Sequence, residues 1–290
     1  MKKQSLLAGI ALTFAPLAVA GPIVRSALST AGAGDVTFNG VITSFRTDLG
    51  GSLNAPGACT PSPCTTGRRE INWDGVPVGS SSPNPFPGNF FNGTAGVEPD
   101  ARVRGASFTT PGTGFRVSAT EFSLELPFGP TDFDPFSPSR MFGILGSNIV
   151  DVTFSVPGSP GAEATVRGFG AVFSDVDYPG FTSIEYFDAD DVSLGLFAVQ
   201  SVFPTPSGNS TGSFSFLGVS FDAGERVSRV RITSGAHGLD GDFGLTDDAV
   251  VMDDFIYAEP FDTTVPEPVT TALAGAGLAA LLALRRRRPA

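Results

Sequence analysis

Residues 148–156 read Asn-Ile-Val-Asp-Val-Thr-Phe-Ser-Val, and this stretch decides the fold class. From Val150 onward every second residue is apolar, and polar residues stand between them. A period of two is the spacing of a β-strand that buries one face and exposes the other. The stretch therefore predicts a half-buried strand in a β-sheet protein.

The same kind of pattern returns through the second half of the chain. Further strands are predicted in residues 164–174, 182–187, 193–199, 213–221, 226–233 and 249–257. The second and third of these flank Asp188-Ala189-Asp190-Asp191, whose residue types favour a turn, so we expect a hairpin there. Glycine and proline, with 36 and 24 residues, interrupt the chain at short intervals and favour an all-β fold.

The first half of the chain gives weaker signals. Strands are expected at residues 35–45, 104–109 and 115–126, and long loops at about 50–66 and 80–96. The second loop contains Phe86, Phe90 and Phe91, so we expect its own aromatic side chains to order it. No long apolar pattern with the 3.6-residue period of a helix stands out between residues 21 and 268. Residues 21–262 are therefore predicted to form one antiparallel β-sandwich without a substantial helix.

The N-terminus has the parts of a secretory signal peptide. Lys2 and Lys3 precede an apolar stretch, residues 6–19, which closes on the small residues Ala18-Val19-Ala20. We expect signal peptidase to remove residues 1–20, so that the exported chain begins near Gly21.

The C-terminus carries a second addressing signal. Val265-Pro266-Glu267-Pro268 is followed by an apolar run at residues 269–284 and then by Arg285, Arg286, Arg287 and Arg288. As a helix this run would span about 24 Å, less than the roughly 30 Å of a bilayer core, and the arginines resist translocation. We expect a transient anchor in the inner membrane that a membrane peptidase removes near Pro-Glu-Pro. A short permanent anchor is the alternative.

This order of motif, short apolar segment and basic stop resembles the tail of PEP-CTERM proteins, with Pro266, Glu267 and Pro268 as the signature. Such proteins are exported by Gram-negative bacteria and processed by an exosortase. The resemblance covers under a tenth of the chain. It implies a cell-surface or extracellular-matrix destination, often beside exopolysaccharide, and it implies no enzymatic activity.

Processing at both ends would leave an acidic protein. Without residues 1–20 and 269–290, twelve basic residues remain against 29 acidic ones, which changes the formal net charge from −11 to −17. Lys2 and Lys3 are the only lysines of the chain, so none would remain. Such a surface argues against nucleic acid or anionic lipid as a partner and is compatible with binding cations.

Cys59 and Cys64 flank Thr-Pro-Ser-Pro and are the only cysteines. In an exported protein two such neighbours more often pair than stay free, so we expect a disulfide that clips a surface loop. Metal binding by these cysteines is disfavoured, because the only histidine, His237, supplies at most one further soft ligand.

Residues for common hydrolytic chemistry are scarce. His237 lies in the turn Ser234-Gly235-Ala236-His237-Gly238 with no nucleophile motif beside it, which disfavours a serine or cysteine triad. Glycoside hydrolysis needs two carboxyl groups that are close in space but not in sequence, so the dispersed glutamates do not exclude such a pair. A glycoside hydrolase is therefore the third hypothesis.

Aspartates gather at the ends of the predicted strands. Oxygen ligands on loops suit calcium, which accepts six to eight of them. The candidate calcium ligands are Asp175, Asp177, Asp188, Asp190, Asp253 and Asp254, with Asp191, Asp247 and Asp248 beside them. None of the groups has the spacing of an EF-hand. The alternative is that these aspartates cap turns and protect strand edges.

The single tryptophan lies in Asn72-Trp73-Asp74-Gly75. Trp73 could offer a platform for a sugar ring, with Asn72 and Asp74 bonding the hydroxyl groups; the alternative is a tryptophan of the core. Residues Met252-Asp253-Asp254-Phe255-Ile256 resemble the closing strand of many jelly-roll modules, including carbohydrate-binding ones. That resemblance implies a jelly-roll-like sandwich.

The expected function is that of a non-catalytic surface or extracellular-matrix protein, sorted by its tail and associated with exopolysaccharide. A calcium-assisted carbohydrate-binding module is the alternative, and a glycoside hydrolase comes third. No cofactor is certain from the sequence, and calcium is the candidate.

Overall fold

The computed structural model describes residues 21–60, 64–119, 132–203, 212–222, 226–241 and 247–262. The predicted signal peptide and the predicted sorting tail, including Pro266, Glu267, Pro268 and the four arginines, lie outside these residues. Within the described ranges, no helix has both the length and the apolar character needed to cross a membrane.

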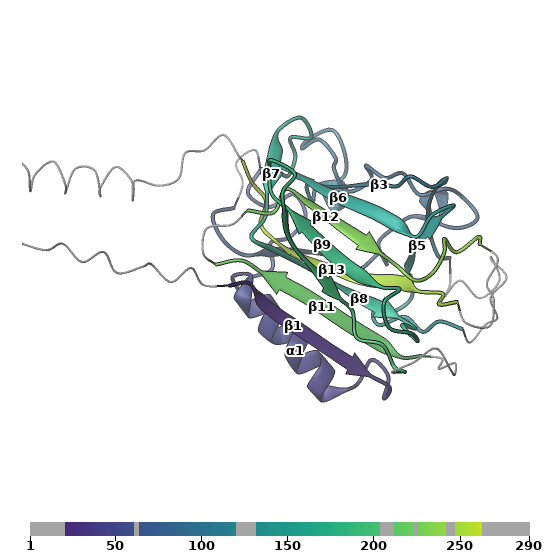
Figure 1. Ribbon diagram of the computed structural model, residues 1–290. Helices are drawn as coiled ribbons and strands as arrows, with labels where there is room; N and C mark the ends of the chain where they lie inside the picture. The colour runs from purple at the N-terminus through teal and green to yellow at the C-terminus, as the bar shows by residue number, and fades with distance from the viewer. Residues whose placement is uncertain are drawn as a thin grey trace, which may run out of the picture.

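Two antiparallel sheets form a β-sandwich, each with seven strands among the described residues (Figure 1). The first sheet has the order β1 (Ile23–Ser29), β11 (Phe214–Ser220), β8 (Gly168–Ser174), β13 (Val251–Ala258), β5 (Phe142–Leu145) and β4 (Gly114–Val117), and β2 (Arg68–Ile71) also pairs with β13. The second has the order β10 (Ser193–Ala198), β9 (Ser183–Phe187), β12 (Arg229–Thr233), β6 (Ile149–Ser155), β7 (Glu163–Thr165) and β14 (Phe261–Asp262), and β3 (Ala106–Thr109) pairs with β6.

The chain alternates between the two sheets in its second half. β8 belongs to the first sheet, the β9–β10 hairpin to the second, β11 to the first, β12 to the second and β13 to the first. The facing sides of the sheets meet in an aromatic core. Phe154 of β6, for example, lies 6.4 Å from Phe169 of β8 and 5.5 Å from Tyr257 of β13, measured between ring centroids.

The sandwich and most strands of the second half are confirmed, but the single strand predicted at residues 164–174 forms two strands, β7 in the second sheet and β8 in the first. The opening stretch forms β6, whose residues alternate between partly exposed and buried positions along its length. The segments on either side of the Asp188–Asp191 turn pair as the expected hairpin. Period-two patterning was therefore a good guide to strands such as β6, but it missed β2, which also has one buried and one wet face.

The strand predicted at residues 35–45 is wrong, because this segment forms the helix α1 (Val36–Asp48). Asp35 caps its N-terminus: Oδ1 accepts hydrogen bonds from the backbone amides of Thr37 at 2.8 Å and Phe38 at 3.2 Å. The buried side chains, Phe38, Ile42, Phe45 and Leu49, recur at intervals of four, three and four residues, which is one face of a helix.

Helix α1 lies against the outer face of the first sheet, next to β1 and β11 (Figure 1). Glycines on that face make room for it. A Cβ atom on Gly170 of β8 or on Gly218 of β11 would stand 2.8 Å from the ring of Phe45, which is closer than Cβ contacts occur. These two glycines are paired across the strands. Helix and sandwich together thus explain why β8 and β11 are buried on both faces.

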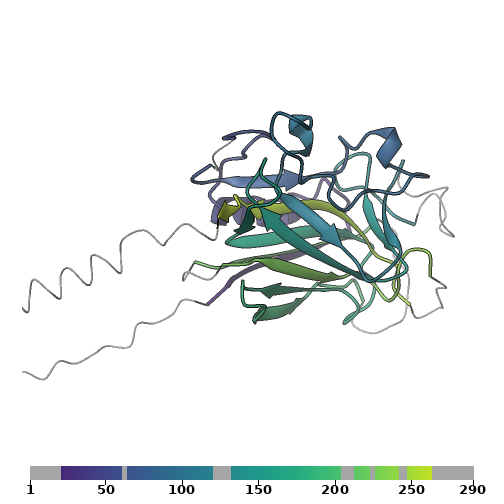
Figure 2. The same ribbon diagram turned by 90° about the horizontal axis from the view of Figure 1, so that it is seen from above.

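The chain between β2 and β3 is a long loop with two short 3-10 turns, η1 (Val78–Ser80) and η2 (Asp100–Arg102). Figure 2 shows this blue segment running along one side of the sandwich. As expected, Phe86, Phe90 and Phe91 are buried, and their rings pack on one another with centroids 5.0 to 6.0 Å apart. The aromatic side chains therefore attach the loop to the core.

The sandwich has two poles that carry different parts of the chain. Ile23 of β1 pairs with Ser220 of β11, which in turn pairs with Gly168 of β8. Thr165, three residues before Gly168, pairs with Phe261 of β14. Both ends of the described chain therefore lie at one end of the sandwich, which we call the tail pole (Figure 1). The opposite end, where β8 ends at Ser174 beside Val251, is called the distal pole.

Candidate functional site

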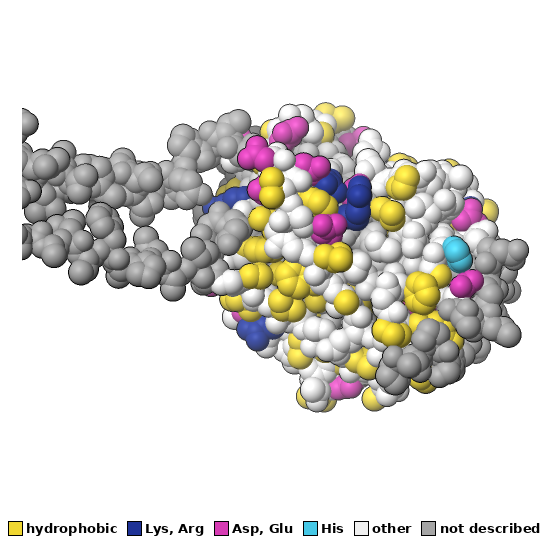
Figure 3. Space-filling view, in the orientation of Figure 1, with side chains coloured by type: hydrophobic (Ala, Val, Ile, Leu, Met, Phe, Trp, Pro, Cys, Tyr) yellow, Lys and Arg dark blue, Asp and Glu magenta, His cyan; other side chains and the backbone are white. Residues whose placement is uncertain are grey.

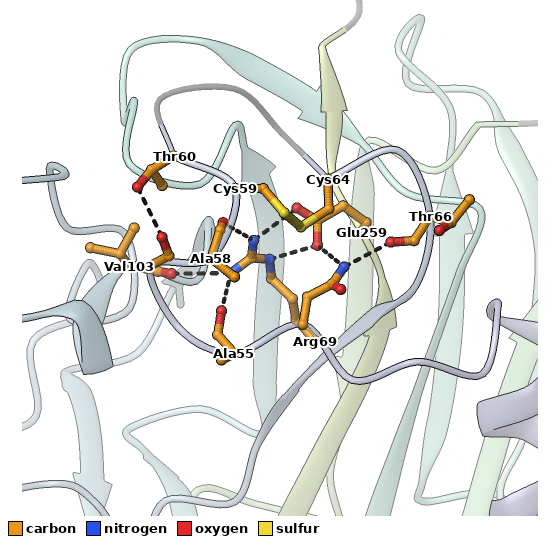
Figure 4. Close-up of a disulfide and its surroundings, with 11 residues drawn as sticks. Ala55, Ala58, Cys59, Thr60, Cys64, Thr66, Arg69, Val103 and Glu259 are labelled. Carbon is orange, nitrogen blue, oxygen red and sulfur yellow. Dashed lines mark hydrogen bonds and ion pairs between the residues drawn. A yellow bond between two sulfur atoms is a disulfide. The ribbon is translucent and has the colours of Figure 1, made fainter.

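The cysteines form a disulfide between Cys59 and Cys64, which lies beside a buried ion pair (Figure 4). Nε and Nη2 of Arg69 each donate a hydrogen bond of 2.8 Å to the carboxylate of Glu259. The guanidinium also donates to the carbonyl oxygens of Ala55, Ala58 and Val103 at 3.2 to 3.4 Å. This loop therefore supplies the carbonyl groups that satisfy a buried arginine, which is a structural role.

Trp73 belongs to the core. It is 1 % exposed, its indole stacks on Phe142 with centroids 4.3 Å apart, and Nε1 donates a 2.8 Å hydrogen bond to the carbonyl of Asp253. Asn72 donates to the Asp74 carboxylate, which also accepts from the backbone amides of residues 139 and 140. A sugar ring has no face of Trp73 to stack on, so the glycan platform at Asn72, Trp73 and Asp74 does not fit the structure.

The aspartates of the β9–β10 turn act locally. Oδ1 of Asp188 accepts hydrogen bonds of 2.9 Å from the backbone amides of Asp190 and Val192. The carboxylate of Asp191 pairs with Arg229 of β12. This is the turn-capping alternative that the sequence left open, and it puts these aspartates at the tail pole.

Asp253 and Asp254 of β13 are buried and hold the segment that precedes β5. Asp253 accepts hydrogen bonds from the backbone amides of Phe136 and Ser137, and the Ser137 hydroxyl lies within hydrogen-bond distance of both carboxyl groups, 3.0 Å from Asp253 and 2.9 Å from Asp254. Burial raises the pKa of Asp253 well above its usual value, and it raises the pKa of Asp254 to about 6 against the effect of the Ser137 hydrogen bond.

A third group of aspartates lies at the distal pole, where Asp175 and Asp177 meet Asp248. The backbone amides of Asp177 and Tyr178 donate to the two carboxylate oxygens of Asp248 at 3.1 and 3.3 Å. Burial, with nearby aspartates as the next cause, raises the pKa of Asp175 to about 9, and burial raises the pKa of Asp248 to about 7.

The six predicted calcium ligands therefore lie in three separate places, and each group has to be judged on its own. Among the residues that the structure describes, no three His, Cys, Asp or Glu side chains form a group already arranged to hold a metal ion. In the turn group Asp188 accepts two backbone hydrogen bonds and Asp190 is exposed, and in the β13 group both carboxyl groups have hydrogen-bond partners. The distal group differs, because Oδ1 of Asp175 is buried without a hydrogen-bond partner.

A polar groove of about 480 Å³ lies on the second sheet near the tail pole. Hydroxyl and amide side chains line much of it: Asn92, Ser107, Thr153, Ser155 and Ser228. Figure 3 shows arginine and acidic side chains gathered over the region of β6 and β12. There Arg229 pairs with Asp151 and stacks 3.7 Å above the ring of Phe187.

Three carboxylates also line this groove, which bears on the hydrolase hypothesis. Asp188 caps its own turn and Asp191 pairs with Arg229, which leaves Glu163 as the third. Glycoside hydrolysis requires one carboxyl group as acid and a second as base or nucleophile. Two of the three carboxylates therefore already take part in contacts that hold the β9–β10 turn and β12.

His237 is half exposed near the distal pole, with Nε2 3.5 Å from a carboxylate oxygen of Asp247. Sequence reasoning missed two other acidic residues near this pole, Asp132 and Asp134, whose charges act on Asp175. Their Asp-x-Asp spacing is the same as that of Asp175 and Asp177, and this repeated spacing was the available signal.

No protein-family model matches the chain, and a comparison with curated proteins found none of similar sequence.

Proposed function

We propose that this chain is a non-catalytic protein of the cell surface or extracellular matrix of a Gram-negative bacterium, exported and then sorted by a PEP-CTERM-type tail. Signal peptidase and an exosortase-type membrane peptidase are its processing partners. The tail holds the protein in the inner membrane until it is cut, and the sandwich is the part that reaches the outside.

The observation that carries the proposal is the position of the sorting motif relative to the fold. β14, the last described strand, ends at Asp262, and Pro266-Glu267-Pro268 begins four residues later. A cut at the motif would therefore leave every described strand in place. Because Gly21 also lies at the tail pole, processing at both ends would leave the distal pole untouched.

Two further features support association with exopolysaccharide. The alternation of strands between two antiparallel sheets supports the finer assignment of a jelly-roll-like sandwich, an architecture that includes carbohydrate-binding modules. The groove on the second sheet presents hydroxyl and amide groups, which are the partners that sugar hydroxyls require. The acidic surface favours a neutral or cation-bridged polysaccharide over an anionic one.

The sorting step is tested with Glu267→Ala in the full chain, expressed in the native host. We expect the wild-type protein to lose its tail and appear outside the inner membrane, while the variant stays uncut in the membrane fraction. Thr264→Ala, two residues before the motif, is the matched control and should behave as wild type. Immunoblots of membrane and external fractions, with the intact mass of the released protein, give the readout. Normal release of Glu267→Ala would overturn the proposal.

A further inference from the structure

Three buried aspartates meet at the distal pole, and they come from loops that are far apart in the sequence. Asp175 and Asp177 follow β8, whereas Asp248 precedes β13. These residues are only 8 %, 7 % and 2 % exposed, respectively. The hydrogen bonds from the amides of residues 177 and 178 to Asp248 fix the two loops against each other.

Asp175 holds a carboxyl oxygen that the protein leaves without a partner. Its Oδ1 is buried and has no hydrogen bond. The backbone at this residue has a φ of +69°, in the left-handed region that aspartate and asparagine adopt more readily than most residues other than glycine. The charged groups that act on Asp175 are four aspartates: Asp177, Asp248, Asp132 and Asp134.

Buried carboxylates are normally compensated by a cationic side chain or by several donors. Among the described residues, the charges that raise the pKa of Asp175 are those of other aspartates, and its Oδ1 has no hydrogen-bond partner. A bound cation would supply the missing partner and offset the repulsion between the aspartates. We propose that Asp175, Asp177 and Asp248 form a calcium-binding site at the distal pole, with Asp132 and Asp134 adding negative charge around it.

Calcium is the cation that this set of groups suits. It takes six to eight oxygen ligands in flexible geometry and combines carboxylates with backbone carbonyls and water, whereas magnesium demands a tighter octahedron. The carboxyl groups are not drawn together around one point in the structure described. Calcium would therefore draw the carboxyl groups of the two loops toward one ion, and these groups would release protons when it binds.

The site lies at the pole opposite the tail, so the inference does not depend on the sorting proposal. It assigns a role to the distal loops: calcium would cross-link the segment after β8 to the segment before β13. The expected consequence is a distal pole that resists unfolding and proteolysis when calcium is present.

Terbium luminescence tests the site in the purified full chain. Tb³⁺ occupies calcium sites, and Tyr178, which follows Asp177 and whose backbone amide donates to Asp248, is the aromatic residue that we expect to sensitise its emission. We expect saturable Tb³⁺ emission on tyrosine excitation, displaced by Ca²⁺ at lower concentration than by Mg²⁺. Asp175→Asn should weaken binding by about tenfold or more, because ligand charge count sets calcium affinity.

Two variants make this test decisive. Asp190→Asn removes the same charge from the exposed turn at the tail pole and should leave terbium and calcium binding unchanged. Tyr178→Phe should dim the sensitised emission while calorimetry still detects calcium. Asparagine tolerates a positive φ, so Asp175→Asn should fold, which circular dichroism and thermal melting would check. Absence of sensitised emission in wild type, or equal binding by Asp175→Asn, would overturn the proposal.

Discussion

The guanidinium of Arg69 and the carboxylate of Glu259 meet in two hydrogen bonds of 2.8 Å, although the two residues are 190 positions apart. Their side chains are 1 % and 0 % exposed. Arg69 belongs to β2, and Glu259 directly follows β13, where the chain passes from the first sheet to β14 in the second. It therefore ties the C-terminal end of the fold to the disulfide loop.

Removing one partner of this pair should be costly. Glu259→Ala leaves a buried guanidinium without its counter-charge, and we expect the free energy of unfolding to fall by about 3 to 5 kcal/mol. Urea unfolding of the processed protein measures this loss. Glu98→Ala breaks the more exposed pair with Arg102 and serves as the control, with an expected loss below about 1 kcal/mol. Equal losses in the two variants would show that Arg69 finds other compensation.

The disulfide should contribute through the same cluster. Replacing Cys59 and Cys64 by serine frees the loop that presents the carbonyls of Ala55 and Ala58 to Arg69. We expect a loss of about 2 kcal/mol from loop closure. The thermal midpoint of the wild-type protein should fall when a reductant is added, and the midpoint of the double variant should not. A reductant effect that persists without the cysteines would contradict this account.

The contact between α1 and the glycines beneath it gives a third prediction. In Gly170→Ala the new Cβ would stand 2.8 Å from the Phe45 ring and 2.8 Å from the Cα atom of Gly218. Overpacking of this kind costs about 1 to 3 kcal/mol. Gly40→Ala, on α1 with nothing within 4 Å of the new methyl group, should instead stabilise by about 0.5 to 1 kcal/mol. Thermal melts compare both variants with wild type, and a neutral Gly170→Ala would show that the helix can shift.

Several strands with a single wet face were predicted from the sequence, but β2, whose residues also alternate between partly exposed and buried positions, was missed. β6 and β12 alternate because only one side of each is buried, and both were found. The helix was missed because α1 contains Val36, Thr37 and Thr43, which favour strands, and because only three of its side chains are buried. The intervals between the apolar residues from Phe38 to Leu49 are nevertheless those of a helix. This spacing was a better guide than the strand preference of single residues.

Among the candidate sites, contacts between sequence neighbours could be predicted, whereas contacts between distant loops could not. The disulfide needed only two neighbours in sequence, so Cys59 and Cys64 were paired without a structure. Asp175 and Asp248 are 73 residues apart and meet only because β8 and β13 are antiparallel neighbours with their loops at one pole. Similarly, nothing local marks Arg69 and Glu259 as partners. Contacts between distant loops depend on sheet order, which the strand pattern alone does not specify.

Burial of the single tryptophan is the fourth prediction. Because Trp73 is enclosed by aromatic rings and bonded to the carbonyl of Asp253, its fluorescence should be blue-shifted and poorly quenched by acrylamide. Addition of polysaccharide should leave the emission unchanged, even if the groove on the second sheet binds it. Free tryptophan in the same buffer is the reference for quenching. A polysaccharide-dependent shift would place the sugar at Trp73 and reject its assignment to the core.

Stability should fall as the pH rises, because several buried carboxyl groups have pKa values above those of the unfolded chain. Below about pH 4 both states are protonated; above it the unfolded chain ionises while the folded protein keeps its protons, so unfolding becomes more favourable. The loss for each group ends when the pH passes its folded pKa, which is about 6 for Asp254, about 7 for Asp248 and about 9 for Asp175.

Asp254 allows this trend to be assigned to one residue. Its shift corresponds to at most about 3 kcal/mol, at 1.36 kcal/mol per pKa unit. In Asp254→Asn the difference in unfolding free energy between pH 4 and pH 8 should shrink by up to that amount, measured by urea unfolding in EDTA. Asp190→Asn, in the exposed turn, should keep the wild-type profile. A profile for Asp254→Asn as steep as that of wild type would mean that this carboxyl group ionises freely in the folded protein.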